Sequence, residues 1–196
     1  MLVPQPIGFL QFGAFWIVVI VGAAALFRSF ARNREFGDAA KKSGLSNVGI
    51  ALQALGFAAA GFGPIRFALP WDAPLSLIST FLVALLGGGA VALFIASTRA
   101  MGKNWSVVAR MRSDHQLVRS GPFAVVRHPI YLALFLYLLS FAIAFGHWQQ
   151  LIAAIPLYWV GTLIRIREEE KLLRAQFGED HARYVREVPA VIPFLK

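Results

Sequence analysis

The stretch Gly121-Pro122-Phe123-Ala124-Val125-Val126-Arg127-His128-Pro129-Ile130-Tyr131 decides how this chain folds, because it joins a polar segment to the apolar run 130–147. Proline suits the first turn of a helix, where the N–H that it lacks would have no partner. We therefore expect a helix to begin at Pro129, with His128 at its cap. The free N–H groups and the dipole of such a terminus attract anions, and Arg127 strengthens that field.

A second interpretation of the same residues is purely structural. In it Arg127 extends toward water, Tyr131 belongs to an interfacial belt of aromatic residues and His128 is a polar cap. These residues alone leave both interpretations open.

The composition indicates an integral-membrane protein. Hydrophobic residues make up 58% of the 196 residues and the mean hydropathy is +0.63, whereas soluble domains are usually about 45–50% apolar. We expect one compact membrane domain over residues 1–196. The chain has no cysteine, which excludes disulfides, thiolate metal sites and cysteine nucleophiles, and we predict no metal site.

Five apolar runs predict an all-α bundle of about five transmembrane helices. The predicted spans are residues 8–27, 47–69, 75–97, 130–147 and 151–164. The fifth run is short for a bilayer core about 30 Å thick, so its helix should continue through Arg165 and Arg167. We expect bends at Pro64 and Pro156 and close helix packing at several glycines. These glycines are Gly56, Gly61, Gly63 and Gly87-Gly88-Gly89.

The basic residues predict the orientation of the bundle. All of the nineteen Lys and Arg residues except Arg66 fall within three segments, 28–46, 98–128 and 165–196. The positive-inside rule makes that side cytoplasmic. We therefore expect the N-terminus outside and the C-terminus in the cytoplasm, with a prokaryotic inner membrane as the setting. The net charge of +9 then reflects orientation and attraction to anionic lipid, and we expect no nucleic-acid partner.

A second group of charged residues follows the fifth span. Residues 165–178 carry apolar side chains at helical spacing, which predicts an amphipathic cytoplasmic helix that stops at Gly178. Arg165 and Glu169 are four residues apart and share a face of this helix. One interpretation is an ordinary ion pair on a solvated helix. The other is a ligand site, because a carboxylate needs Arg or helix N–H groups and an ammonium needs Glu, and the methionine part of S-adenosylmethionine carries both beside a sulfonium.

The order and spacing of these motifs resemble a known family. The residues are Leu117-Val118-Arg119-Ser120-Gly121-Pro122-Phe123, Arg127-His128-Pro129-Ile130-Tyr131, Arg165 through Gly178, Tyr184 and Val188-Pro189-Ala190-Val191-Ile192-Pro193. They resemble the isoprenylcysteine carboxyl methyltransferases and the related phospholipid methyltransferases. The similarity covers residues 98–196, whereas residues 1–97, the three N-terminal spans, match only in being hydrophobic. The resemblance implies an integral-membrane helical bundle whose S-adenosylmethionine pocket lies at the cytoplasmic face, closed by the C-terminal helix.

The resemblance also implies which residues form the site. The family's Arg-His-Pro-x-Tyr motif falls on Arg127 to Tyr131, and its Glu-Glu motif falls on Glu169 and Glu170, with Glu168 as an alternative. The expected catalytic residues are Arg165, Arg127 and Glu169. The expected cofactor contacts are His128, Tyr131, Glu169, Glu170, Leu117 and Val118. Two departures, Ala133 where the family usually has Gly and His181 where a Tyr is common, leave the identity of the acceptor open.

The expected reaction is methyl transfer from S-adenosylmethionine to a lipophilic acceptor at the cytoplasmic membrane face. By resemblance, that acceptor is the carboxylate of a prenylated cysteine, reached from the membrane lipid, and catalysis depends on alignment and exclusion of water. Three alternatives remain. They are a phospholipid amine or small-thiol methyltransferase, a sterol reductase that uses a nicotinamide cofactor, and a non-catalytic membrane scaffold or transporter.

Overall fold

The structure, a computed structural model, describes residues 5–32, 41–42, 44–105, 110–111 and 116–193. Its helices are α1 (Phe9–Arg32), α2 (Gly44–Gly61), α3 (Pro74–Met101), α4 (Pro129–Ala144) and α5 (Leu151–Glu187). Three short 3₁₀ turns lie between them: η1 (Gly102–Asn104), η2 (Gly121–Ala124) and η3 (Trp148–Gln150). Two short strands, β1 (Lys41–Lys42) and β2 (Arg110–Met111), pair antiparallel. The predicted all-α membrane fold is confirmed.

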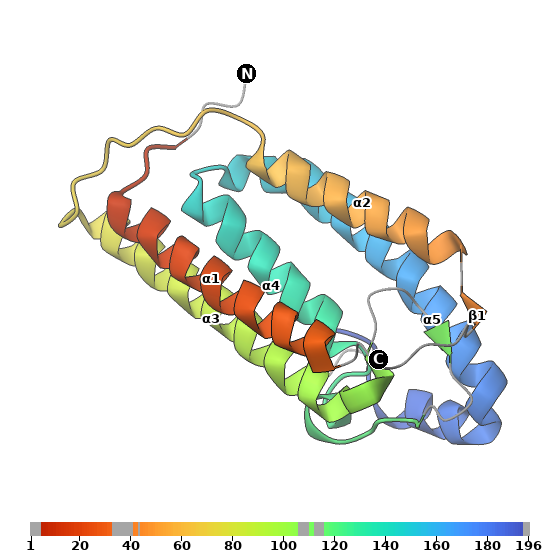
Figure 1. The fold of residues 1–196 in the computed structure, drawn as a ribbon. Coiled ribbons are helices and arrows are strands. Elements are labelled where there is room, and N and C mark those ends of the chain that lie inside the picture. The colour runs from red at the N-terminus through yellow and green to blue at the C-terminus, as the bar shows by residue number, and fades with distance from the viewer. Residues whose placement is uncertain (1–4, 33–40, 43, 106–109, 112–115, 194–196) are drawn as a thin grey trace.

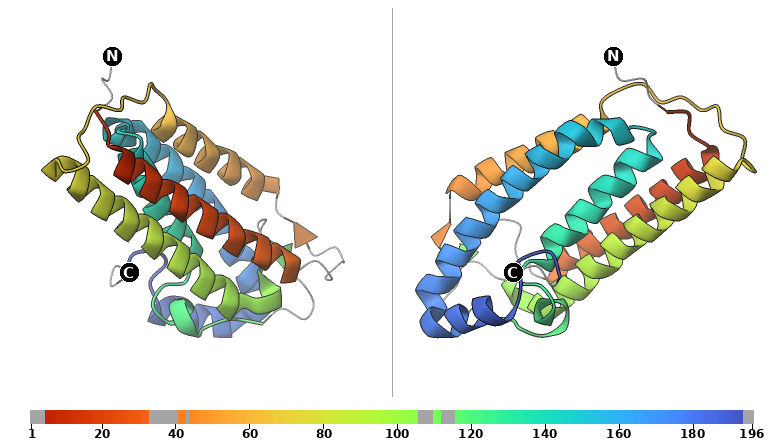
Figure 2. Two further views of the ribbon diagram at one scale, coloured as in Figure 1. Left: turned by 60° about the vertical axis from the view of Figure 1, so that its left-hand side comes forward. Right: turned by 180° about the vertical axis from the view of Figure 1, so that it is seen from behind.

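The helices form two packed groups, and α4 is the helix of the first group that faces the second. α1, α3 and α4 lie side by side in one group, and α2 packs along α5 in the other (Figure 1). The view from behind in Figure 2 shows α4 between α5 and the α1–α3 pair. Two clusters fill the core: Leu138 of α4 packs with Tyr158 of α5, and Phe15 of α1 packs with Val83 of α3. α4 therefore joins the two groups through apolar contacts.

Membrane crossing is supported for three of the five predicted spans. Among the described residues, α1, α2 and α3 are long and apolar enough to cross a bilayer. α4 has 16 residues, or about 24 Å at 1.5 Å per residue, which is shorter than a hydrocarbon core of roughly 30 Å. α5 begins apolar and becomes charged from Arg165 onward. Full crossing by α4 and α5 stays a prediction.

Two predicted helix ends are wrong. α2 ends at Gly61, so Pro64 lies beyond the helix and does not bend it. The reason is an alternative set of backbone partners, because the N–H of Ile7 donates to Arg66 O (2.8 Å) and the N–H of Ala68 donates to Ile7 O (3.1 Å). α4 ends at Ala144, three residues before His147, where Gly146 takes a left-handed φ of 71°.

α5 follows the prediction in part. It runs as predicted through Arg165 and Arg167, and Pro156 lies inside it. Within α5, only Gly178 leaves the helical range, with a φ of 50°. The predicted stop at Gly178 is thus a break, after which the helix resumes as far as Glu187.

Close helix packing is confirmed at some of the predicted glycines. A Cβ on Gly56 would lie 3.0 Å from Ala154 O, and a Cβ on Gly61 would lie 2.7 Å from the Phe141 ring. Gly87 is equally crowded, with Ser140 Oγ and Val18 at 2.9 Å. A Cβ on Gly63, which lies beyond the end of α2, would be 3.2 Å from His147 Nε2. Packing does not explain Gly88 and Gly89, because a Cβ on either would have no atom within 4 Å.

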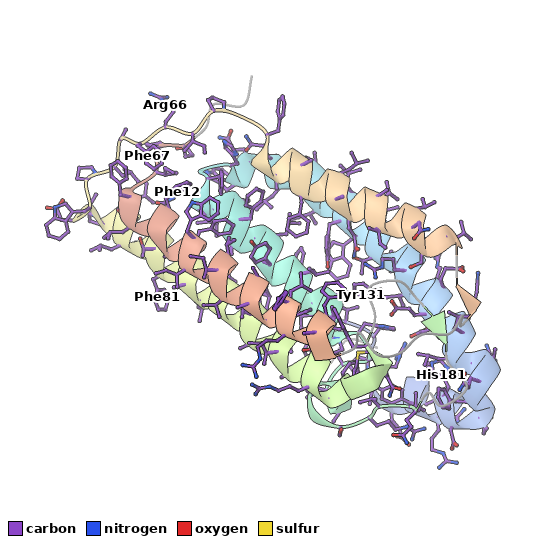
Figure 3. The ribbon with its side chains drawn as sticks, viewed as in Figure 1. Phe12, Arg66, Phe67, Phe81, Tyr131 and His181 are labelled. Atoms are coloured by element: carbon purple, nitrogen blue, oxygen red, sulfur yellow. The ribbon has the colours of Figure 1, made fainter. Side chains whose placement is uncertain are left out.

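The predicted separation of basic residues matches the two ends of the bundle. Figure 3 shows Arg66 at the end of the molecule opposite to His181. Arg34, Arg112 and Lys196, which the charge argument includes, lie outside the described residues. Which end faces the cytoplasm stays a prediction.

Candidate functional site

The site begins where α4 begins. His128 has φ −125° and ψ 60° and is the N-cap, and Pro129 opens the helix, as predicted. The backbone N–H groups of Arg127 and His128 do not join the helix but donate to Pro189 O and Ala190 O, each at 2.9 Å. The polypeptide after α5 therefore lies against the start of α4.

His128 bridges two carboxylates. Its Nδ1 lies 3.4 Å from Glu169 Oε2 and its Nε2 lies 3.2 Å from Glu170 Oε1. An ionised carboxylate can only accept hydrogen bonds, so this position between two carboxylates favours the imidazolium form of the ring, in which both nitrogens carry a proton. Burial alone would lower the pKa of His128, but the hydrogen bonds and negative charges of Glu169 and Glu170 outweigh it and raise that pKa above 6.5.

Arg127 completes the pairing of Glu170. Its Nε and Nη2 donate to Glu170 Oε1 at 3.0 and 2.7 Å, and its Nη1 donates to the carbonyl oxygens of Val185 and Val188. Burial raises the pKa of Glu170, but the hydrogen bonds and charges of His128 and Arg127 lower it to about 2. Glu170 is therefore an anion held between two cations.

Glu169 connects this pair to a deeper group of aromatic and polar side chains. The Tyr131 hydroxyl donates to Glu169 Oε1, and the Tyr158 hydroxyl donates to Tyr131 O at 2.5 Å. The guanidinium carbon of Arg165 lies 5.0 Å from the centroid of the Tyr131 ring, which is a cation–π geometry. Arg165 is only 8% exposed and donates from Nη1 to Gln53 Oε1 of α2 at 2.9 Å.

The structure thus brings together most of the residues that the sequence singled out. They are Arg127, His128, Tyr131, Arg165, Glu169 and Glu170. Glu168, the alternative member of the acidic pair, accepts from Lys171 at 2.6 Å. Leu117 and Val118 are half-buried in the irregular segment before η2, and their expected contact with a cofactor rests on the resemblance alone.

The polypeptide after the break in α5 folds back over the segment before α4, and we call residues 179–193 the C-terminal clasp. The Tyr184 hydroxyl donates to Phe123 O at 2.6 Å, and Arg119 lies over the Tyr184 ring at 5.4 Å. Arg119 also donates to Asp180 O. Val191 of the clasp packs on Tyr131, so the clasp lies against this end of the cluster.

His181 in the clasp is 3% exposed, and its Nε2 has no hydrogen-bond partner among the described residues. Burial is the main cause that lowers its pKa; the charge of Glu170 opposes this effect, and the charges of Arg127 and His128 add to it. Figure 3 labels His181 at the same end of the molecule as Tyr131. The sequence analysis marked this position only as a departure from the family.

Sequence reasoning missed two residues of the site. Gln53 is 5% exposed, and its amide nitrogen donates to Thr162 Oγ1 at 2.8 Å. Both were treated as part of apolar spans. A signal existed, because Gln53 shares a helical stripe with Gly49 and Gly56, and a polar side chain on the small-residue face of a membrane helix usually points into the bundle.

Comparison with known proteins finds a family and relatives that this chain resembles. The model of the isoprenylcysteine carboxyl methyltransferase (ICMT) family matches residues 82–175. The protein-S-isoprenylcysteine O-methyltransferase of Schizosaccharomyces pombe is 28% identical over 123 residues, which are 61% of this chain and 52% of that protein. The protein of the same name from Saccharomyces cerevisiae is 33% identical over 89 residues, 45% and 37% of the two chains. This chain thus spans about half the length, or less, of the curated relatives that it matches.

A solved structure shares the fold. It is described as the eukaryotic intramembrane Ras methyltransferase ICMT without a monobody, and it aligns with a TM-score of 0.53 at 22% identity over 76% of this chain and 52% of that chain. The family match covers α4 and the first part of α5, which carry His128, Tyr131, Arg165, Glu169 and Glu170. Residues 82–175 of the chain thus match the isoprenylcysteine carboxyl methyltransferase family, and the chain shares the fold of a multi-pass integral-membrane protein.

Proposed function

We propose that this chain transfers a methyl group from S-adenosylmethionine to the carboxylate of a lipophilic, isoprenylcysteine-like acceptor at the cytoplasmic membrane face. The observation that carries the proposal is the contact of the Arg127-His128 corner with Glu169 and Glu170 beside the buried Arg165. Family members use S-adenosylmethionine as methyl donor, and the named relatives are O-methyltransferases of isoprenylcysteine.

The charged cluster fits the amino-acid end of S-adenosylmethionine. The charge of Glu170 is balanced by Arg127 and His128, so we assign Glu170 the role of holding these two side chains in place. Glu169 is paired with His128 and with a neutral hydroxyl of Tyr131, so we assign it the ammonium group. The carboxylate of the cofactor would bind Arg127, whose Nη2 has a second N–H besides the one that it donates to Glu170, and His128 would add positive charge. When bound, S-adenosylmethionine supplies a methyl group that its sulfonium already activates.

The acceptor is assigned to the deeper part of the site. Arg165 precedes Glu169 by four residues, which is about 6 Å along the helix axis, on the side toward the apolar part of α5. A buried guanidinium at that depth suits an anionic head group on an apolar tail. Arg165 would orient the acceptor carboxylate, while Tyr131 forms the wall between acceptor and cofactor.

The remaining contribution of the protein is alignment and exclusion of water. Tyr158 holds the backbone of Tyr131 through a 2.5 Å hydrogen bond, and the clasp covers the cytoplasmic side. A fixed arrangement of two reactants supplies a large part of the rate without acid–base groups. Leu117 and Val118 are assigned apolar contact with the adenosine.

A carboxylate acceptor fits this site better than an amine. An amine must lose a proton around the time of transfer and therefore needs a base. Glu170, whose pKa is lowered to about 2, is too weakly basic for that role at neutral pH, and Glu169 is assigned to the ammonium group of the cofactor. A carboxylate has no proton to lose, so the site needs only to hold it in place.

The proposal can be tested with purified protein in lipid nanodiscs. Calorimetry should show binding of S-adenosylmethionine and of its demethylated product, and Glu169→Gln should weaken that binding at least about tenfold, as expected for loss of a charge-assisted contact. The matched control is Glu168→Gln, because Glu168 pairs with the exposed Lys171, and it should bind normally.

The class of acceptor can be determined by incubating the protein with methyl-labelled S-adenosylmethionine and identifying the labelled product. Three acceptors should be compared: an S-prenylated N-acetylcysteine, phosphatidylethanolamine and a small thiol. Carboxyl methylation gives an ester that releases labelled methanol in mild base, whereas N- or S-methyl products keep the label. Base-stable label would reassign the acceptor, and absence of cofactor binding would refute the enzyme proposal in favour of a scaffold or transporter.

A further inference from the structure

Gln53 links the N-terminal half of the chain to the candidate site. It lies on α2, one of the three helices suited to cross a membrane, and outside the segment 82–175 that the family model matches. Its side chain makes two hydrogen bonds to α5, to Thr162 Oγ1 at 2.8 Å and to Arg165 Nη1 at 2.9 Å. These contacts join residues more than a hundred positions apart in sequence.

The orientation of the Gln53 amide is determined by its partners. A guanidinium only donates hydrogen bonds, so the amide oxygen must face Arg165 and the amide nitrogen must face Thr162. Thr162 is fully buried, and its hydroxyl accepts the hydrogen bond from the amide nitrogen in this orientation. The guanidinium of Arg165 is thereby fixed between the Gln53 oxygen on one side and the Tyr131 ring on the other.

Two glycines bring the helices close enough for this contact. A Cβ on Gly161 would lie 2.6 Å from Gly49 O, and a Cβ on Gly49 would lie 2.7 Å from Gly161 O. The backbones of α2 and α5 therefore approach at the level of Gln53, between Gly49 and Gly56. The short side chain of Gln53 reaches Arg165 because of this close approach.

We propose that Gln53 is a positioning and specificity-determining residue, which holds Arg165 with a neutral amide so that the guanidinium receives an anionic acceptor. The inference rests on the proposed carboxyl methylation. A carboxylate in place of the amide would compete with the acceptor for the same cation, whereas the amide orients Arg165 without cancelling its charge. α2 would thus take part in choosing the acceptor.

The test substitution is Gln53→Glu, which keeps the size of the side chain and adds a negative charge against Arg165. Wild type and variant are compared in nanodiscs for two ligands, the S-prenylated N-acetylcysteine and its methyl ester, which lacks the charge. We expect the KM of the carboxylate to rise at least tenfold and the inhibition constant of the ester to change less than twofold. The dissociation constant of S-adenosylhomocysteine should stay unchanged, which also shows that the variant is folded.

Two further variants separate charge from structure. Gln53→Met removes the hydrogen bonds without adding charge, and it should raise the KM of the carboxylate severalfold, less than Gln53→Glu does. Gln150→Glu makes the same chemical change at the far end of the bundle, where Gln150 donates to Phe62 O, and it should behave as wild type.

A purely structural role would weaken the carboxylate and the ester together, and that result would overturn the inference while leaving the proposed function in place. An unchanged KM in Gln53→Glu would also overturn it. If the wild type binds cofactor but forms no base-labile ester, the proposed function and this inference fail together.

Discussion

Replacing Glu170 by glutamine tests the charged cluster most directly, because Glu170 accepts hydrogen bonds from both cations. Its pKa falls from an ordinary 4.5 to about 2, and at 1.36 kcal/mol per pKa unit this difference corresponds to about 3 kcal/mol of stabilisation. The side chain is 26% exposed, so solvent weakens the interaction, and we expect Glu170→Gln to cost about 2 kcal/mol at pH 7.

The pH dependence of this loss has a definite sign. A carboxylate whose pKa is lowered in the folded state stabilises the protein above its unfolded pKa and loses that effect as the pH falls toward the folded value. The difference between wild type and Glu170→Gln should therefore be full above about pH 5 and shrink between pH 4.5 and pH 3. Part of the difference should remain at pH 3, because Glu170 becomes protonated in the folded state only near pH 2, where it and glutamine are nearly equivalent.

The measurement is thermal unfolding in detergent, followed by tryptophan fluorescence at several pH values. A loss of about 2 kcal/mol corresponds to a melting temperature lower by about 4–8 °C in a chain of this size. Glu179→Gln is the control, because Glu179 pairs with Arg186 where both side chains are exposed, and such pairs contribute little. The reasoning is refuted if the two variants melt alike at pH 7, or if the deficit of Glu170→Gln persists undiminished at pH 3.

Three further predictions concern neighbouring residues. Because the pKa of His128 is raised in the folded state, its contribution to stability is full below the ordinary value of 6.5 and is lost as the pH rises through the folded-state pKa, so the melting temperature should fall as the pH rises above 6.5, and His128→Ala should lack this slope. Tyr131→Phe keeps the ring under Arg165 but removes the hydrogen bond to Glu169, so calorimetry should show S-adenosylmethionine binding weakened about five- to tenfold with little change in acceptor KM. Gly161→Leu should destabilise the protein by about 1–3 kcal/mol through the contact of α2 with α5, whereas thermal unfolding of Gly88→Leu should match wild type, because a Cβ at Gly88 would have no atom within 4 Å.

Local chemistry explains what the sequence predicted correctly. Pro129 lacks an N–H and follows two residues with charge or hydrogen-bonding capacity, so the helix start and its His128 cap followed from short-range rules. Both charged clusters were assigned to the same membrane side, and their convergence followed once the resemblance placed them in one site. The sequence placed the acidic pair on Glu169 and Glu170 with Glu168 as an alternative, and the side-chain contacts follow that order, because Glu170 meets Arg127 and His128 whereas Glu168 meets Lys171.

What the sequence did not predict depends on contacts distant along the chain. The end of α2 at Gly61 follows from backbone pairing of the 66–69 segment with Ile7, and no local pattern marks that pairing. Gln53 was overlooked for the same reason, because its partners lie on α5 and its own span is otherwise apolar. Hydropathy identifies a membrane helix but does not show which side chains of that helix meet another element.

The clasp is joined to the start of α4 partly through main-chain hydrogen bonds from Arg127 and His128, which do not depend on the side chains at positions 189 and 190. The chain also contains no cysteine, so a single thiol introduced at the exposed Glu187 would accept a spin label or fluorophore with no competing site to remove. Movement of the clasp during turnover can therefore be timed spectroscopically, in a bilayer, on a protein that differs from the natural sequence by one residue.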